Sequence, residues 1–323
     1  MKLAALTERI IMGYKIEPAE AKSLLKEDLS SLLFGAELIA RHYKTDRINF
    51  CSIVNAKSGA CSENCGFCAQ SAHHKTKVEK YALLDDKRLS AALSKSVKDG
   101  ASCFGIVTSG RKLTDKDIDR ICSFVSKNKN RKIRISASLG DIGKDGLRKL
   151  KKAGVSRYHH NLETSESFFP RICTTHTFAD RIRTAGNVKK AGLELCCGGI
   201  IGLGEKPGQR IELAFALRKL GADSVPINIL NPVRGTPMGK RERMAPEDIL
   251  RTIAVFRFIL PDKDISVCGG REINLGKYQP WIFSAGANGM MVGGYLTTPG
   301  RPAWQDRKMV EILGYRISGK KEE

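Results

Sequence analysis

Residues 61–68 read Cys-Ser-Glu-Asn-Cys-Gly-Phe-Cys and place three cysteines, Cys61, Cys65 and Cys68, at the spacing C-x3-C-x2-C. A cubane iron–sulfur cluster and a structural zinc ion both normally take four protein ligands. Three thiolates on one short loop therefore either share the metal with a distant fourth ligand or leave one metal position open. An iron with an open position can bind the amino and carboxylate groups of S-adenosylmethionine (SAM) and deliver an electron to the sulfonium. The spacing favours this radical-forming centre over a partial zinc site.

An apolar run just before these cysteines is the first of eight short segments with the composition of β-strands. Amphipathic stretches of about ten to fifteen residues separate the segments, which is typical of βαβ units in a parallel sheet. Eight such units predict an α/β fold, a (β/α)8 TIM-type barrel. A doubly wound sheet is the weaker alternative, because no G-x-G-x-x-G follows the first segment. The expected strands are 48–54, 103–108, 133–138, 156–161, 193–198, 224–229, 264–268 and 289–292. The expected helices are 87–99, 115–128, 144–153, 177–191, 208–220, 246–260, 278–285 and 304–313.

The length of 323 residues suits one barrel domain with additions at its ends. We expect an N-terminal helical extension over residues 1–45, with its helical stretch running from about 18 to 42 because proline suits a first helical turn. The barrel is expected over residues 46–315. Residues 316–323 are expected to form a short C-terminal tail of basic and acidic residues.

Polar and glycine-rich runs follow the expected strands at the ends where barrel enzymes carry their chemistry. The cysteine loop follows the first strand, and other runs follow later ones. They are Thr108-Ser109-Gly110, Asn161-Leu162-Glu163, Gly198-Gly199, Asn228 and Gly269-Gly270-Arg271. This placement supports the barrel and predicts an active site at that rim.

The chain carries 55 Lys and Arg against 34 Asp and Glu, a formal net charge of +21. Such a charge could serve a polyanion such as RNA, but the basic residues are scattered and no basic stripe is interleaved with aromatic residues. We therefore expect no nucleic-acid partner. An acidic electron donor of the flavodoxin or ferredoxin type would suit the same charge.

No apolar run approaches the ~18 residues that a membrane span needs, and the N-terminus lacks the pattern of a signal peptide. The sequence thus predicts a cytoplasmic protein with no membrane association. In that compartment ten cysteines are better explained by metal binding or catalysis than by disulfides.

Ordered motifs along nearly the whole chain resemble those of the radical SAM superfamily and, within it, the biotin synthase family. The first half carries Asn55-Ala56-Lys57-Ser58-Gly59, Cys68-Ala69-Gln70-Ser71, His160-Asn161-Leu162-Glu163-Thr164-Ser165 and His176-Thr177-Phe178-Ala179-Asp180-Arg181. The second half carries Gly198-Gly199-Ile200-Ile201-Gly202-Leu203-Gly204-Glu205, Ser224-Val225-Pro226-Ile227-Asn228, Gly235-Thr236-Pro237, Gly269-Gly270-Arg271-Glu272 and Tyr295-Leu296-Thr297-Thr298. The fold of that family is the full barrel, in agreement with the strand count.

The resemblance implies a reaction in which sulfur is inserted between two unactivated carbons of dethiobiotin. A reduced [4Fe-4S] cluster cleaves SAM to methionine and a 5′-deoxyadenosyl radical, which removes a hydrogen atom from dethiobiotin. The carbon radical takes sulfur from an auxiliary iron–sulfur cluster inside the barrel, and a second SAM completes the ring. Radicals of this kind need a closed site that excludes water.

The resemblance also implies roles for individual residues. Cys61, Cys65 and Cys68 bind the [4Fe-4S] cluster, and Phe67 shields it near the adenine ring. The residues expected at SAM are Asn161, Glu163, Arg181 and Gly199, and those expected at dethiobiotin are His159, Asn161, Asn228, Thr297 and Thr298. Glu163 is longer than the usual aspartate, and His159 stands where asparagine is common. The alternatives are a helix-capping role for Glu163 and a surface position for Arg181.

The ligands of the auxiliary cluster depart from the family pattern. Three cysteines and one arginine usually hold a two-iron cluster, and Cys103, Cys196 and Arg271 match three of these positions. Ser136 occupies the fourth, and serine replaces a thiolate poorly. We therefore expect a remodelled cluster, either [2Fe-2S] or larger.

New cysteines near these positions are candidates to complete that cluster. Cys268 is a first candidate beside Cys103 and Cys196, and Cys197 follows. Strand alternation, however, places Cys268 and Arg271 on opposite faces, so both can point inward only at an irregular strand end. The remaining three cysteines, Cys51, Cys122 and Cys173, are interpreted as structural.

Two other activities stay open from the sequence. Ser136 and His159 would suit a related radical SAM mutase or lyase that inserts no sulfur, and the charge would suit a tRNA-thiolating enzyme. The resemblance further implies iron–sulfur assembly proteins as partners and is compatible with a homodimer.

Overall fold

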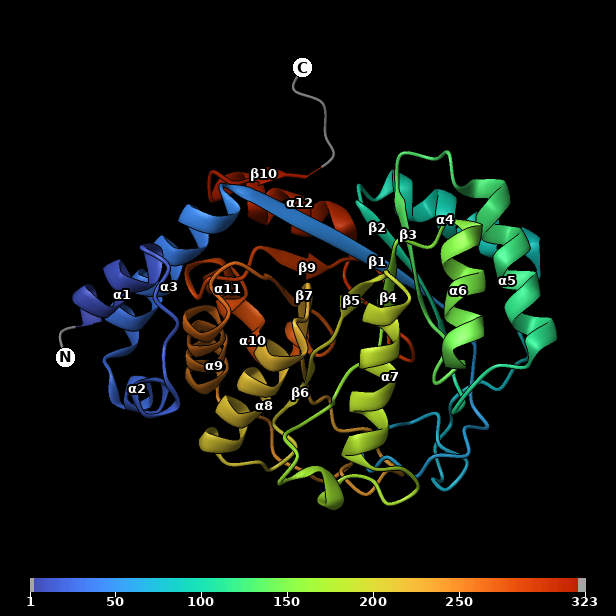
Figure 1. The fold of residues 1–323 in the computed structure, drawn as a ribbon, viewed down its shortest axis with the longest axis horizontal. Coiled ribbons are helices and arrows are strands. Elements are labelled where there is room, and N and C mark those ends of the chain that lie inside the picture. The colour runs from blue at the N-terminus through green and yellow to red at the C-terminus, as the bar shows by residue number, and fades with distance from the viewer. Residues whose placement is uncertain (1–2, 319–323) are drawn as a thin grey trace.

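The computed structural model describes residues 3–318 and shows parallel strands closed into a barrel with helices around it (Figure 1). The strands are β1 (Arg47–Lys57), β2 (Cys103–Thr108), β3 (Arg134–Ser138), β4 (Arg157–His159), β5 (Glu194–Cys196), β6 (Gly199–Ile201), β7 (Ser224–Ile229), β8 (Asp264–Val267), β9 (Gly289–Met291) and β10 (Arg316–Ile317). They pair in the order β1-β2-β3-β4-β5-β7-β8-β9, and β9 pairs with β1 to close the ring. The predicted (β/α)8 barrel is confirmed.

The fifth strand of the barrel is divided into β5 and β6. Cys196 pairs with Ser224, and pairing with β7 resumes only at Gly199 with Ile227. The interruption lies opposite Pro226, which has no N–H to donate to a neighbouring strand. A side chain at Gly198 would also place its Cβ 1.9 Å from the Pro226 carbonyl oxygen. The continuous strand expected over 193–198 is therefore shorter, and β5 ends at Cys196.

Helices follow the strands around the outside of the barrel. They are α4 (Asp86–Lys98), α5 (Asp115–Asn128), α6 (Gly143–Ala153), α7 (Phe178–Lys190), α8 (Pro207–Leu220), α9 (Pro246–Ile259), α10 (Arg271–Leu275), α11 (Trp281–Ser284) and α12 (Ala303–Ile312). Side chains of Thr and Asp at several N-termini accept the free backbone N–H groups of the first turn, as Thr114 does for α5 and Thr177 for α7. The segment expected as one helix over 278–285 is two short turns.

The N-terminal extension contains three helices, α1 (Leu3–Ile11), α2 (Pro18–Ser23) and α3 (Leu29–Lys44). They lie at one side of the barrel in Figure 1, where α3 packs on α9. The single helix expected over 18–42 is wrong, because a 3-10 turn at Leu24–Lys26 interrupts it and Asp28 caps a new helix. Helix α1 was not predicted.

Alternation along the strands separates two environments. Phe50 and Phe104 are fully buried in the apolar layer between barrel and helices. Their neighbours Cys51 and Cys103 line a cavity inside the barrel. Barrels of this type usually fill their interior with Val, Ile and Leu, so an interior lined by thiols and hydroxyls is prepared for a ligand.

Part of the expected C-terminal tail joins the sheet, because β10 pairs with β1 at Ile48 and Ile317. Residues 319–323 of that tail lie outside the described residues. Among residues 3–318 no helix combines the length and apolar character needed to span a membrane.

Candidate active site

The loop with the three cysteines follows β1 and is closed by its own backbone. The N–H of Cys61 donates to the Gln70 carbonyl over 3.0 Å, and the N–H of Cys68 donates to the Cys65 carbonyl over 2.9 Å. Burial raises the pKa of the Cys68 thiol to about 11, and the nearby charge of Cys61 adds to the rise. These backbone hydrogen bonds within the loop help to hold its thiols at the rim of the barrel.

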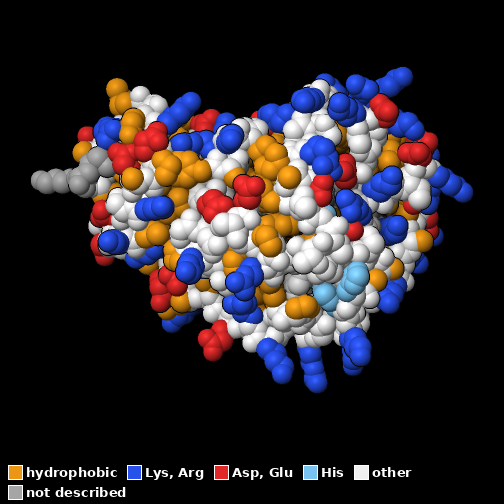
Figure 2. Space-filling model, turned by 60° about the horizontal axis from the view of Figure 1, so that its bottom comes forward, with side chains coloured by type: hydrophobic (Ala, Val, Ile, Leu, Met, Phe, Trp, Pro, Cys, Tyr) orange, Lys and Arg blue, Asp and Glu red, His pale blue; other side chains and the backbone are white. Residues whose placement is uncertain are grey.

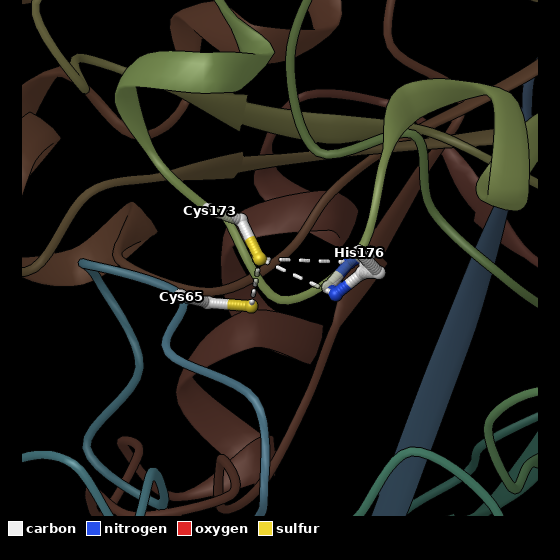
Figure 3. A group of neighbouring side chains, drawn as sticks. All are labelled: Cys65, Cys173 and His176. Carbon is white, nitrogen blue, oxygen red and sulfur yellow. Dashed lines mark hydrogen bonds between the residues drawn. The ribbon is translucent and has the colours of Figure 1, made fainter.

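Cys173 lies against the cysteine loop instead of serving only the core, as Figure 3 shows. Its Sγ is 3.8 Å from Sγ of Cys65 and 3.3 Å from Nδ1 of His176. The hydrogen bond with Cys173, together with burial, raises the pKa of Cys65. His176 in turn contacts the Glu63 carboxylate over 2.5 Å, which ties the loop to the segment before α7.

The end of β4 carries the residues expected at SAM. Asn161 Nδ2 donates to the Glu163 carboxylate over 3.3 Å, and its Oδ1 accepts the Gly198 N–H over 3.0 Å. Arg181 on α7 donates to the Asn161 carbonyl over 2.9 Å and lies 3.4 Å from the Glu163 carboxylate. The structure brings these three residues together, and the Arg181 side chain is only 13% exposed.

Gly199 allows two backbone segments to approach closely at this point. The Ile200 N–H donates to the Glu163 carbonyl over 2.7 Å, and Glu163 has a φ of +69°, which is strained for a residue with a side chain. A Cβ at position 199 would lie 2.5 Å from the Glu163 oxygen. The contact holds the Glu163 carboxylate at the rim, where it lines the cavity.

The substitution Gly199→Ala is expected to lower stability by about 1–3 kcal/mol and to weaken SAM binding, because overpacking displaces Glu163. Gly186→Ala is the control, since a Cβ there meets nothing within 4 Å in the middle of α7. It should leave stability unchanged or raise it by up to about 1 kcal/mol. Thermal unfolding and SAM titration of both variants measure the difference; equal behaviour would contradict the argument.

The residues expected at dethiobiotin lie farther along the same cavity, whose volume is about 370 Å³. Asn228 lines it while its Oδ1 accepts the Gly269 N–H over 2.9 Å. Thr297 and Thr298 line it from the segment after β9, which is anchored where Asn55 Nδ2 donates to the Leu296 carbonyl over 2.9 Å. Apolar walls with a few fixed polar groups are typical of small-molecule sites.

His159 lies deeper, between these residues and the cysteines of the barrel interior. Its Nδ1 is 3.3 Å from Sγ of Cys196, on the neighbouring strand. Burial, with the charges of Arg181 and Arg157, lowers the pKa of His159 to about 4. The imidazole is therefore neutral at physiological pH.

Four cysteines line the deeper part of the cavity: Cys51, Cys103, Cys196 and Cys268. Cys51 and Cys103 are paired on β1 and β2, and their hydrogen bond, burial and the charges of Cys103, Cys268 and Cys196 raise the pKa of Cys51. Burial raises the pKa of Cys196 to about 11 and that of Cys268 to about 12. Three of the four were predicted, whereas Cys51 was interpreted as structural.

Two predicted candidates lie elsewhere. Cys197 is buried in the apolar layer outside the barrel wall. Arg271 begins α10, and its guanidinium donates to Gln279 and to Asp306. Cys268 thus points into the cavity and Arg271 away from it, in the opposite orientations that strand alternation predicts. Ser136 does line the cavity, 3.5 Å from Sγ of Cys103.

The donor sets at both ends fit iron–sulfur clusters. Thiolates are the ligands that such clusters prefer. Among the described residues that line the cavity, Glu163 at the rim supplies the only carboxylate. The deeper part offers four thiols and several hydroxyls instead, which does not suit a hard cation.

Comparisons with known proteins agree with this geometry. Residues 56–217 match the model of the radical SAM superfamily, and residues 226–316 match the biotin and thiamin synthesis associated domain. The chain is thus a radical SAM enzyme whose barrel includes this second domain.

Full-length relatives narrow the class. The biotin synthase of Geotalea daltonii is 50% identical over 98% of both chains, and that of Geobacter sulfurreducens is 47% identical over 97% of both. The chain belongs to the biotin synthase family.

Solved structures share the fold at low identity. A methylornithine synthase has a TM-score of 0.82 at 19% identity and covers 97% of both chains. A maturase of the [FeFe]-hydrogenase, HydG, has a TM-score of 0.83 at 16% identity over 99% of this chain and 76% of its own. These likenesses support the complete barrel alone.

Proposed function

We propose that the barrel converts dethiobiotin to biotin by radical insertion of sulfur. The observation that carries the proposal is one cavity that Cys68 lines at the rim and four further thiols line deeper inside. When bound, the [4Fe-4S] cluster supplies the electron that cleaves SAM, and the auxiliary cluster supplies the sulfur. The chain's own residues then bind the two substrates in line between them.

The rim residues hold SAM. Cys61, Cys65 and Cys68 are the proposed [4Fe-4S] ligands, with Phe67 lining the cavity beside them. Asn161 and Glu163 present side-chain oxygens and an amide to the ribose, which offers hydroxyl donors and acceptors.

Arg181, which does not line the cavity, reaches its edge through Asn161 and Glu163 and is proposed to pair with the SAM carboxylate. Gly199 keeps the backbone close enough for this arrangement.

Dethiobiotin is proposed to lie between the rim and the four thiols. Asn228 and His159 face the part of the cavity that would take the ureido ring, and Thr297 and Thr298 face the tail carboxylate. The largely apolar wall excludes water from a reactive carbon radical. The neutral imidazole of His159 can donate a hydrogen bond without adding charge.

The proposed auxiliary ligands are Cys51, Cys103, Cys196 and Cys268. Cys51 is proposed to supply the thiolate that Ser136 lacks, because both residues lie beside Cys103 on the two strands next to β2. Cys197 and Arg271 are withdrawn from the ligand set, since neither lines the cavity. The nuclearity, two irons or more, is decided by iron and sulfide analysis.

Arg181→Lys is expected to raise the KM for SAM by at least about 10-fold, because a lysine cannot keep the guanidinium contacts to His176, Asn161 and substrate together. Arg183→Lys on the same helix is the control; Arg183 is exposed and pairs with Asp180. Its KM should change less than about 2-fold. Steady-state formation of 5′-deoxyadenosine measures both, and a shared response would count against the assignment.

The decisive test is anaerobic incubation of the reconstituted protein with dethiobiotin, SAM and a reductant. Biotin, methionine and 5′-deoxyadenosine should form together. Formation of 5′-deoxyadenosine that does not depend on dethiobiotin would overturn the proposal in favour of a radical SAM enzyme without sulfur insertion.

The remaining partners are proposed on charge and class. A net charge of +21 suits an acidic flavodoxin or ferredoxin as electron donor, and basic side chains are spread over the face shown in Figure 2. The family also suggests a cytoplasmic location, which cell fractionation tests. It suggests iron–sulfur assembly proteins as partners, which co-purification tests, and a homodimer, which light scattering tests.

A further inference from the structure

A guanidinium lies among the four deep thiols. Arg157 belongs to β4, its side chain is 8% exposed, and it lines the cavity together with Cys51, Cys103 and Cys196. Of the described residues that line this cavity, it is the only lysine or arginine. Nothing in the sequence pattern pointed to it.

The contacts of Arg157 hold the group in place but leave most of its donors unused. Its Nε donates to the Glu194 carboxylate over 2.9 Å, and Nη2 lies 3.7 Å from the Asp264 carboxylate. A guanidinium has five N–H donors. Within residues 3–318, no hydrogen bond is found for the other four. A ligand in the cavity that accepts hydrogen bonds from these donors would therefore be stabilised.

The register of the strands places Arg157 beside the deep thiols. Arg157 pairs with Ser136 on β3, and the Ser136 hydroxyl lies 3.5 Å from Sγ of Cys103. His159, two residues further along β4, pairs with Cys196 on β5. The cation and the thiols therefore share one wall of the cavity.

A cluster held by four thiolates concentrates negative charge in a water-poor barrel. Such charge is stabilised by a fixed cation and by N–H donors to sulfur, which also raise the reduction potential. Arg157 is the only lysine or arginine that lines the cavity in the described part of the chain, so it is the cation placed to do this.

We propose that Arg157 is the positioning residue of the auxiliary cluster, supplying the positive charge and N–H donors that its sulfur atoms require. This inference rests on the proposed function and adds a residue that neither binds substrate nor ligates iron. Glu194 and Asp264 fix the guanidinium from β5 and β8, so its position is set by the barrel wall. The competing explanation is a purely structural ion pair that joins these strands.

The test compares Arg157→Met and Arg157→Lys with the control Arg134→Met. Arg134 contacts the same Glu194 at 3.6 Å but is 43% exposed and does not line the cavity. All variants are reconstituted anaerobically and analysed for iron, sulfide and the reduction potential of the auxiliary cluster. Arg157→Met should lose the auxiliary cluster at least about 10-fold faster and shift its potential downward. Arg157→Lys should fall between, and Arg134→Met should match the parent protein.

An unchanged potential and unchanged cluster retention in Arg157→Met would overturn the inference and leave the ion pair as its role. Equal shifts in Arg157→Met and Arg134→Met would do the same, because they would trace the effect to Glu194. If Arg157→Met fails to fold, Arg157→Lys takes its place, because it retains a cation but fewer N–H donors. A reduction potential below that of the parent protein supports the inference, and an unchanged potential overturns it. A parent protein with only one cluster after reconstitution would overturn the proposed function itself, which is a separate outcome.

Discussion

Replacing Cys61, Cys65 and Cys68 together by alanine is expected to abolish both 5′-deoxyadenosine and biotin formation. The three residues are the only cysteines on the rim loop, and a cluster with fewer thiolates than three has no stable attachment there. Without this centre no electron reaches SAM. The measurement is product formation under reducing conditions, with iron and sulfide analysis of the same sample.

The same variant should retain iron and sulfide at the deeper site. Cys51, Cys103 and Cys196 lie within β1, β2 and β5, and Cys268 directly follows β8, so the barrel strands hold all four outside the rim loop. A triple variant that holds no cluster at all would contradict the two-centre interpretation. The visible spectrum of the retained cluster would, in addition, report the auxiliary site without interference from the first centre.

Cys51→Ala is expected to give the opposite pattern, with biotin formation lost and cleavage of SAM retained. The substitution removes one of four proposed ligands and leaves the rim loop unchanged. Loss of a thiolate ligand should cost most of the auxiliary cluster, because metal affinity falls by about 10–100-fold even when only a supporting residue is removed. Single-turnover assays for biotin and 5′-deoxyadenosine, together with sulfide content, measure the effect.

Cys197→Ala is the matched control for that experiment. Cys197 neighbours Cys196 in the sequence but is buried in the apolar layer, so its loss should lower stability and leave sulfide content intact. If Cys197→Ala lost the auxiliary cluster while Cys51→Ala kept it, the proposed ligand set would be wrong. Ser136→Cys extends the series. It adds a fifth thiol beside Cys103, and sulfide content should not rise because four thiols already hold the cluster.

The barrel could be predicted from the sequence because its signal repeats eight times and each strand carries apolar residues on the side that faces the helices. Local chemistry that depends on a neighbouring strand could not. The break between β5 and β6 arises opposite Pro226, which lies about 30 residues later in the chain. The 3-10 turn at Leu24–Lys26 has no glycine or proline to announce it.

The candidate site was predictable where a motif lies on one short segment, as in the cysteine loop. It was less so where strands must be aligned, because the sequence does not give the register between them. Cys51 was missed for this reason, although its place next to outward-facing Phe50 could have indicated an inward side chain. Arg271 was placed by motif alone, and its turn into α10 carries it to Asp306.

Strand β4 and the residues just after it set the depth at which three side chains enter the cavity. Arg157 and His159 occupy alternate positions of β4, and Asn161 follows two residues after the strand ends. All three line the cavity, and an extended backbone at ~3.3 Å per residue separates the first from the last by about 13 Å. Point substitutions here should each damage one level. Deletion of a single residue from β4 would instead turn Tyr158 and His160 toward the interior. The side chains proposed for the auxiliary cluster, for dethiobiotin and for SAM would then all be displaced together. The spacing of the strand itself is therefore under as much constraint as the side chains that it carries.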